Sequence, residues 1–335
     1  MIRSDVADFP RIDFDINAAT LSWRGFAAVA LLAAGCDGSH VGEVSISRER
    51  GERRELPPEL SGYAQAVEAS RLDFIRVDAQ REDGTEPWAS KFRGMPYLPE
   101  GAAYPLDPHG LPLTLLAQLN FEEMPALEGY PRKGILQFFI SGEESREHVW
   151  GMLSGRDEPY DPMRYFASMQ DQKYFRVICR PEVIRDRKRL AQPPGMLYAL
   201  QGFLPITEEA RLSFRRSRGP VLVDDYRFAR TFGEDARPFF ARFGEREQEI
   251  AQGYIDFSYE RSIGKVGGYA SFVQGDPRSI RPDEDWLLLL EIESADPGDG
   301  VEILWGDGGV ANLLIRREDL RKLDFSRVVY YWDNH

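Results

Sequence analysis

The stretches Leu115–Leu119 (LLAQL) and Gly134–Ile140 (GILQFFI) decide the fold that the sequence predicts. Each is an apolar run of strand length, and each is interrupted by one amide, Gln118 in the first run and Gln137 in the second. Short apolar runs of this kind are typical of buried strands. A glycine-containing turn with a lysine, Ser90–Gly94 (SKFRG), precedes both runs. The segment therefore predicts two strands behind a tight turn.

The same order of features recurs in the second half of the chain. A glycine turn with a lysine again precedes two apolar runs, which are Gly264–Gly268 (GKVGG), Leu288–Ile292 (LLLEI) and Gly309–Ile315 (GVANLLI). The polar residues inside these runs are Glu291 and Asn312. The lysine precedes the amide of the second run by 46 residues in the first half (Lys91) and by 47 in the second half (Lys265). This agreement predicts an internal duplication.

The predicted fold class is mainly β (α+β), with antiparallel sheets built from two duplicated modules, near residues 88–141 and 262–316, and with peripheral helices. Further strands are expected at 174–180, 220–224 and 327–333, and helices near 181–192, 205–216 and 238–252. The segments between the modules lack the regular strand and helix alternation of a parallel sheet. We expect the two modules to pack on each other, because neither can bury both of its faces alone.

Composition and charge exclude some classes of partner. The chain has 335 residues, of which 42% are apolar, and this is enough to bury a core without a metal or disulfide. A formal net charge of -13 would repel phosphate backbones, so no nucleic-acid partner is expected. Two basic clusters, 185–189 and 211–218, are interpreted as solvated helix faces.

The sequence contains no motif for a metal or cofactor site. The chain has two cysteines, Cys36 and Cys179, and four histidines, none with the spacing of metal ligands. No nucleophile elbow and no phosphate-binding glycine loop occur. We therefore predict no metal and no cofactor.

Residues 1–36 have the pattern of a leader. Phe26–Gly35 (FAAVALLAAG) is an apolar run about half as long as a membrane-spanning helix, and Cys36 follows directly. Small residues before a cysteine are typical of a bacterial lipobox, whose cysteine receives the lipid. The first 25 residues carry four Asp against three Arg, unlike the positive start of a signal, and translation from Leu21 would remove this conflict. The alternative is a buried N-terminal helix with Cys36 in its core.

The leader interpretation sets the domain organisation and the location. Residues 37–56 are expected to form a polar tether, and residues 57–335 a single folded domain. The protein would then be a membrane-anchored lipoprotein of the cell envelope, attached to the membrane through Cys36 only. Without the leader, it would be cytoplasmic.

Several motifs occur in a characteristic order along the folded part. They are 90–99 (SKFRGMPYLP), 115–121 (LLAQLNF), 134–141 (GILQFFIS), 274–278 (QGDPR), 305–307 (WGD) and 324–333 (DFSRVVYYWD). In this order they resemble the YwqG-like family of uncharacterised bacterial proteins, over roughly residues 57–335. The resemblance implies a β-rich fold, and it implies no activity and no catalytic residues. Arg93 stands where that family usually has glycine.

Eight residues form the predicted ligand-binding set, which is Gln118, Gln137, Glu291, Asn312, Trp305, Asp307, Lys91 and Lys265. The polar residues inside the apolar strands either satisfy backbone groups between the packed modules or line a cleft along the pseudo-two-fold axis. The second interpretation requires that Gln137 or Asn312 is accessible to solvent.

Two classes of function remain open. The first is a non-catalytic binding or interaction module that recognises a protein or a small ligand, because no reactive constellation is found. The alternative is an enzyme that uses a carboxylate (Asp307 or Glu291) with a lysine (Lys91 or Lys265) in a cleft between the repeats. No catalytic residue is assigned.

The leader interpretation makes a direct prediction. Intact-mass analysis of the native protein should find a chain that begins at a diacylated Cys36, because the signal is removed when the cysteine receives its lipid. A cytosolic protein that retains Met1 and has an ordered helix through Cys36 would contradict the interpretation.

Overall fold

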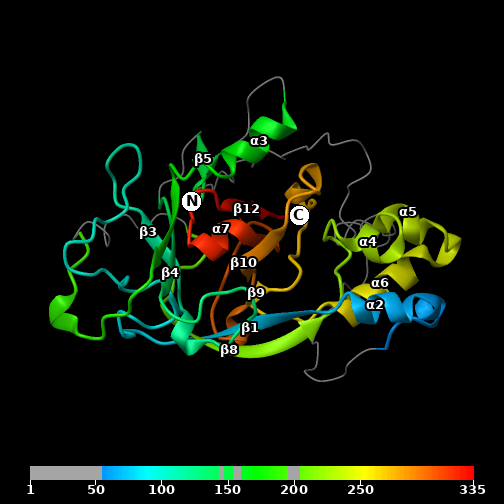
Figure 1. Cartoon of the computed structure of the whole chain (residues 1–335), viewed down its shortest axis with the longest axis horizontal. Coiled ribbons are helices and arrows are strands. Elements are labelled where there is room, and N and C mark those ends of the chain that lie inside the picture. Colours follow the sequence, from blue (N-terminus) through cyan, green and yellow to red (C-terminus); the bar gives the residue numbers. More distant parts are fainter. Residues whose placement is uncertain (1–54, 143–146, 154–159, 195–203) are drawn as a thin grey trace, which may run out of the picture.

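A computed structural model describes residues 55–142, 147–153, 160–194 and 204–335. The predicted leader, Cys36 and all but the last two residues of the predicted tether lie outside the described residues. Within the described ranges the protein is mainly β. Ten antiparallel strands form one sheet that curls into a half-barrel, and a small group of helices lies beside it (Figure 1).

The ten strands of the sheet are β1 (Leu72–Arg81), β2 (Lys91–Phe92), β3 (Thr114–Asn120), β4 (Ile135–Ile140), β7 (Phe175–Arg180), β8 (Ala210–Gly219), β9 (Gly264–Gly267), β10 (Trp286–Glu293), β11 (Val310–Arg316) and β12 (Val329–Asp333). Their order across the sheet is β12-β11-β10-β9-β1-β8-β2-β3-β4-β7. The strands expected at 174–180 and 327–333 are confirmed as β7 and β12.

Two arms extend from the central pair β1 and β8. Outward from β1 lie β9, β10, β11 and β12, and outward from β8 lie β2, β3, β4 and β7. In each arm the spatial order follows the chain order. Each arm also has a register shift between its second and third strands, between Leu115 and Ala117 in one arm and between Leu288 and Leu290 in the other. We call these the first arm (β2, β3, β4, β7) and the second arm (β9 to β12).

The central strand β8 corrects a sequence expectation. The sequence predicts a helix near 205–216, but Ala210–Gly219 is a ten-residue strand paired along its length with β1. Its apolar residues alternate, since Ala210 and Leu212 are buried in the main core while Arg211 and Arg215 are not. A period of two is the signature of a half-buried strand. The basic cluster 211–218 is therefore a strand and not a solvated helix face.

The other expectations between the arms hold only in part. Residues 220–224 form no regular strand, and Val221, Leu222 and Val223 enter a second core instead. The stretch 181–192 contains only one short 3-10 helix, η3 (Arg187–Arg189). The helix expected near 238–252 is two helices, α5 (Ala236–Ala241) and α6 (Glu247–Ser258), separated by η5 (Gly244–Arg246).

The remaining helical segments are η1 (Pro58–Tyr63), α2 (Ala64–Ala69), η2 (Phe121–Glu123), α3 (Pro162–Ser168), α4 (Phe228–Phe232), η6 (Pro277–Ile280), η7 (Pro297–Asp299) and α7 (Arg317–Lys322). Of these, α2 and α4 lie with α5 and α6 as a helical lobe at one end of the sheet (Figure 1). Aromatic side chains such as Phe228, Phe239 and Tyr254 fill the core of this lobe. The main core lies inside the curled sheet.

A buried ion network joins the lobe to the sheet. Arg278 on η6 is fully buried, and its Nη2 lies 2.8 Å from Asp225 Oδ2 and 2.7 Å from Asp276 Oδ2. Asp225 precedes α4 of the lobe, whereas the Arg278 guanidinium also lies over the ring of Phe272 in the main core. Removing one partner of such a buried pair typically costs about 3–5 kcal/mol. The network therefore fixes the lobe to the half-barrel.

A two-stranded hairpin, β5 (His148–Val149) and β6 (Met152–Leu153), packs against β12. Its Trp150 contacts Trp305 and Trp332, with ring centroids 5.5 Å and 4.7 Å apart. The Tyr330 hydroxyl of β12 donates to the Trp150 carbonyl. The hairpin thus ties the loop before β11 to β12, at the outer edge of the second arm.

Candidate functional site

Gln118 and Gln137 hold one loop residue of the first arm by both of its backbone groups. They are directly opposite each other in the β3–β4 ladder. Gln118 Oε1 accepts the Tyr97 N–H at 2.8 Å, and Gln137 Nε2 donates to the Tyr97 carbonyl at 2.9 Å. Gln118 Nε2 also donates to the carbonyls of Pro87 and Ala89, each at 2.7 Å. We call Gln118, Gln137 and Tyr97 the first clamp.

Glu291 and Asn312 hold one loop residue of the second arm in the same way. They are opposite each other in the β10–β11 ladder. Glu291 Oε2 accepts the Ser271 N–H at 2.6 Å, and Asn312 Nδ2 donates to the Ser271 carbonyl at 2.8 Å. Ser271 follows Lys265 by six residues, as Tyr97 follows Lys91. We call Glu291, Asn312 and Ser271 the second clamp.

The clamps explain why polar residues interrupt apolar strands. The loops after β2 and β9 cross their arms, so the backbone groups of Tyr97 and Ser271 are buried without a neighbouring strand to pair with. Buried backbone groups need hydrogen-bond partners. A pair of side chains supplies the acceptor and the donor that a strand would otherwise give.

The burial of Gln137 and Asn312 shows whether either amide is accessible to solvent. The exposed fraction is 1% for Gln137 and 0% for Asn312, and both side chains are bonded to backbone carbonyls. Of the two interpretations of these residues, the open cleft is wrong, and the bonding of buried backbone groups is the one that the structure supports. The physical reason is that the loop residue held by each amide covers it.

Trp305 and Asp307 lie apart from the clamps. Trp305 is fully buried and packs against Trp150 and Trp332, so it belongs to the main core. Asp307 lies on an exposed turn, where its backbone carbonyl accepts the N–H of His335. The two residues do not converge with the strand amides on a common opening.

The two predicted lysines are buried in different surroundings. Lys91 is fully buried, and its Nζ donates to the Glu86 carbonyl at 3.0 Å. Burial lowers the pKa of Lys91 to about 8, with the charge of Glu209 opposing the shift. Lys265 Nζ lies 2.9 Å from Glu291 Oε1, so the structure brings together one of the predicted lysine and carboxylate combinations.

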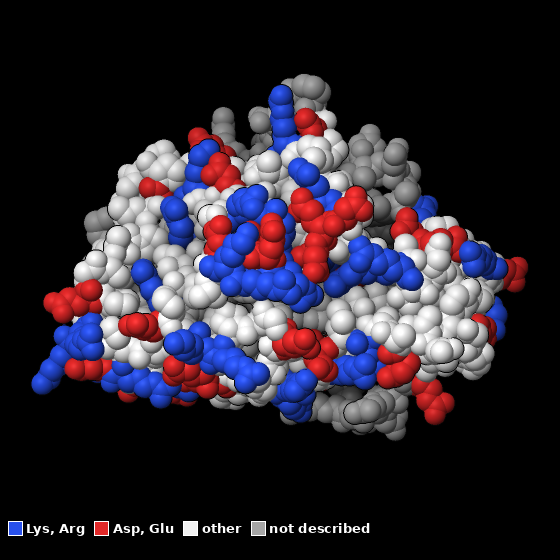
Figure 2. Space-filling model, in the orientation of Figure 1, with Lys and Arg blue, Asp and Glu red and all other residues white. Residues whose placement is uncertain are grey.

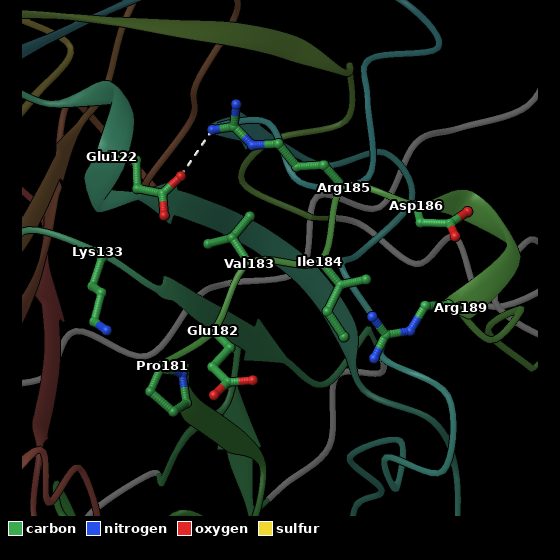
Figure 3. Close-up of a pocket in the computed structure, with 9 residues that line it drawn as sticks. All are labelled: Glu122, Lys133, Pro181, Glu182, Val183, Ile184, Arg185, Asp186 and Arg189. Atoms are coloured by element: carbon green, nitrogen blue, oxygen red, sulfur yellow. Dashed lines mark hydrogen bonds and ion pairs between the residues drawn. The ribbon is translucent and has the colours of Figure 1, made fainter.

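A surface hollow of about 570 Å³ lies at the end of the first arm where β3 and β7 finish and β4 begins. It is lined by Glu122, Lys133, Pro181, Glu182, Val183, Ile184, Arg185, Asp186 and Arg189. In Figure 3 Val183 and Ile184 lie in the middle of this group, with charged side chains around them. We call this group of residues the hollow.

The charges around the hollow are of both signs and are partly unpaired. Arg185 Nη2 forms an ion pair with Glu122 Oε2 at 2.9 Å, which closes one side (Figure 3). Lys133, Glu182 and Arg189 form no ion pair with another residue that the structure describes. Mixed charge is also the pattern of the face in Figure 2, where groups of basic and acidic side chains lie side by side.

The first clamp also shapes the hollow. The Tyr97 hydroxyl accepts the N–H of Ile184 at 2.7 Å and donates to the carbonyl of Glu182 at 3.1 Å. The backbone of Tyr97 is itself held by Gln118 and Gln137. Tyr97 therefore connects the two parts: Gln118 and Gln137 hold its backbone, and its hydroxyl holds the loop that lines the hollow.

A cluster of titratable side chains that the sequence did not predict surrounds Tyr174. The ring of His148 stacks on the ring of Tyr174 at a centroid distance of 3.9 Å, and the centroid of the His109 ring lies 6.3 Å from that of Tyr174. Glu147 accepts a hydrogen bond from the Tyr174 hydroxyl. Burial lowers the pKa of His148, and the charges of Asp107 and Glu147 oppose this shift. In the described residues no group of three or more His, Cys, Asp or Glu side chains is placed to hold a metal ion.

The fold and the site define a class of mainly β protein, a curled antiparallel sheet with a helical lobe. Its strand amides bond buried backbone groups, and its open hollow is lined largely by the loop after β7. The chain belongs to the family described as domain of unknown function (DUF1963), whose model matches residues 90–334. The match begins one residue before β2 and so leaves out the central strand β1. No curated protein gives a significant match. No helix in the described part of the chain is long and apolar enough to cross a membrane.

The first clamp predicts a stability effect. Gln118→Leu should lower the free energy of unfolding by at least about 2 kcal/mol, because each buried group left without a partner costs about 1–3 kcal/mol and three backbone groups lose theirs. Urea unfolding measures this effect. The matched control is Gln80→Leu on β1, which is exposed and should change stability by less than about 0.5 kcal/mol. Equal losses in both variants would contradict the clamp.

Proposed function

We propose that this protein is a non-catalytic binding module that docks a polypeptide segment in the hollow. The observation that carries the proposal is the convergence of exposed charges of both signs on the half-buried Val183 and Ile184, on a loop fixed by the Tyr97 hydroxyl. By contrast, the strand amides and both lysines of the predicted site are buried. The exposed surface that could bind a partner is therefore the loop of residues 181–189 that lines the hollow.

The chemistry of the hollow favours a peptide over a compact small ligand. Ligand pockets usually enclose most of a small molecule in a largely apolar cavity. In the hollow, Glu182, Arg185 and Arg189 are exposed, and the apolar part consists of short aliphatic side chains. An extended segment with one aliphatic side chain, flanked by charged residues, would pair with this arrangement. Recognition of this kind is specific even where its affinity is modest.

The enzyme alternative has one observation in its favour, which is the contact between Lys265 and Glu291. However, their side chains are 7% and 0% exposed, and Ser271 beside them is fully buried. A substrate would reach this pair only after the loop of the second clamp had opened. The binding module is therefore the better-supported function.

We also propose that the two arms arose by duplication of one module and that the chain is YwqG-like. Three features support the duplication: the matching chain order of the two arms, the register shift at matching places, and a loop residue held six positions after a lysine in each arm. The quoted motifs also recur in the order that the YwqG-like resemblance requires. A common origin accounts for all of these features together.

Anchoring through Cys36, and hence a bacterial cell-envelope location, is also part of the proposal. Its support is the sequence of residues 26–36 alone, and the intact mass of the native chain tests it. An anchored domain with an exposed recognition loop would present the hollow to a protein partner near the membrane.

Selection from a phage-displayed library of random dodecapeptides tests docking in the hollow. The full-length protein is the bait, and selected peptides are then measured by calorimetry. We expect binding to weaken at least tenfold in Arg189→Glu, which reverses a charge on the rim. Binding should also weaken in Tyr97→Phe, which keeps both backbone bonds of the clamp and removes the hydroxyl that fixes Glu182 and Ile184.

The matched control is Tyr104→Phe in the same arm, whose hydroxyl donates to the Leu113 carbonyl away from the hollow. It should bind the peptides like the parent protein. If no peptide is enriched, or if selected peptides bind Arg189→Glu and Tyr97→Phe unchanged while both variants stay folded, the proposal is wrong.

A further inference from the structure

The two arms differ in charge at corresponding positions. The first arm has Lys91 on β2 with the amides Gln118 and Asn120 on β3. The second arm has Lys265 on β9 with the acids Glu291 and Glu293 at the same interval on β10, and Lys91 faces Gln118 as Lys265 faces Glu291. All six side chains are at least nine-tenths buried. The second arm thus replaces two neutral amides by two carboxyl groups.

The carboxyl groups of the second arm share one counter-charge. Glu291 and Glu293 are two residues apart on a strand, so their side chains point to the same face. Glu291 Oε1 lies 2.9 Å from Lys265 Nζ, whereas Glu293 forms no ion pair with a described residue. Glu293 accepts a hydrogen bond from the hydroxyl of Tyr259, the residue that follows α6, and its Oε1 is buried with no described donor to bond it. The Glu293 carboxyl group lies within hydrogen-bond reach of the Glu291 carboxyl group.

The other groups near the pair add no cation that is free to neutralise it. Ser271 on the clamp loop contacts Glu291 through its N–H and its hydroxyl, and Asn312 faces Glu291 from β11. Arg76 is opposite Lys265 on β1, and it is already paired with Asp78 and Glu260. Among the described residues, the site therefore contains two carboxyl groups and one available ammonium group.

We propose that Glu291, held beside the unpaired carboxyl group of Glu293, keeps a bound proton, and that loss of this proton at alkaline pH releases the end of α6. Two carboxylates held close together in a site shielded from water do not both ionise easily when one ammonium balances them. Glu293 is the more exposed of the two, at 8%. The repulsion is relieved when Glu293 turns toward solvent, and this movement breaks its hydrogen bond with Tyr259.

The titration has a defined sign. Burial raises the pKa of Glu291 to about 8, with Lys265 opposing the shift and Glu293 adding to it. A group whose pKa is raised in the folded state stabilises the fold below its unfolded pKa, and this stabilisation is lost as the pH rises through the folded pKa. The contribution of Glu291 should therefore be lost as the pH rises from about 4.5 to about 8.

The test compares the thermal unfolding midpoint of Glu291→Gln with that of the parent protein between pH 5.5 and pH 9. The variant gives the second arm the amide that the first arm has as Gln118. The readout is the difference between the two proteins, because Lys91 and His148 contribute pH dependences of their own in both. We expect the variant to gain stability relative to the parent as the pH rises. A difference that does not change with pH would overturn the proposal.

Two further measurements keep the proposal testable if Glu291→Gln folds poorly. Infrared spectroscopy of the parent protein at pH 7 should show the band of a protonated carboxyl group. Burial raises the pKa of Asp333 to about 7, so Asp333 adds to this band, and the spectrum of Asp333→Asn measures how much of the band comes from Asp333. The exposed Glu302→Gln is the control and should leave both the band and the pH dependence unchanged. Disappearance of the whole band in Asp333→Asn would show that Glu291 holds no proton at pH 7.

Discussion

The structure depends on two loop residues whose backbone is held by side chains instead of by a strand. Strand β2 has two residues and β9 has four, and after each the chain turns across its own arm. Folding across an apolar sheet buries the N–H and C=O groups of Tyr97 and Ser271, and this arrangement is stable only if both groups find partners. The opposed polar residues of the next two strands supply these partners. The arms are therefore covered and fixed at the same points.

The strands with the strongest signals could be predicted from the sequence. The apolar runs of β3, β4, β10 and β11 predict these four strands, and the structure pairs β3 with β4 and β10 with β11. The two central strands lack the apolar runs that mark these four strands. In β1 and β8 apolar residues such as Val77 and Leu212 alternate with charged ones, and this period of two predicts a half-buried strand that a search for apolar runs overlooks.

The candidate site is harder to predict, because its shape comes from contacts between distant segments. Nothing local in residues 181–189 predicts a hollow, since the loop is positioned by the Tyr97 hydroxyl from another part of the chain. In the same way, the histidines around Tyr174 come from separate segments, His109 from a loop and His148 from β5. The polar residues inside strands are recognisable as unusual, but the sequence alone does not decide whether they face solvent or backbone. The two arms thus share an arrangement of strands and clamps, and they differ in the residues beside the buried lysine, which are the amides Gln118 and Asn120 in the first arm and the acids Glu291 and Glu293 in the second.

Amide hydrogen exchange at Tyr97 and Ser271 tests the clamps most directly, because it reports the two backbone groups on which the fold depends. Both amides should exchange only through global unfolding, with protection equal to that of the β3 and β10 core amides. His109, in an exposed loop of the first arm, provides the comparison for a residue outside the clamps. If Tyr97 and Ser271 exchange as fast as His109, the side chains do not hold the loops, and the clamps are not the constraint on which the fold depends.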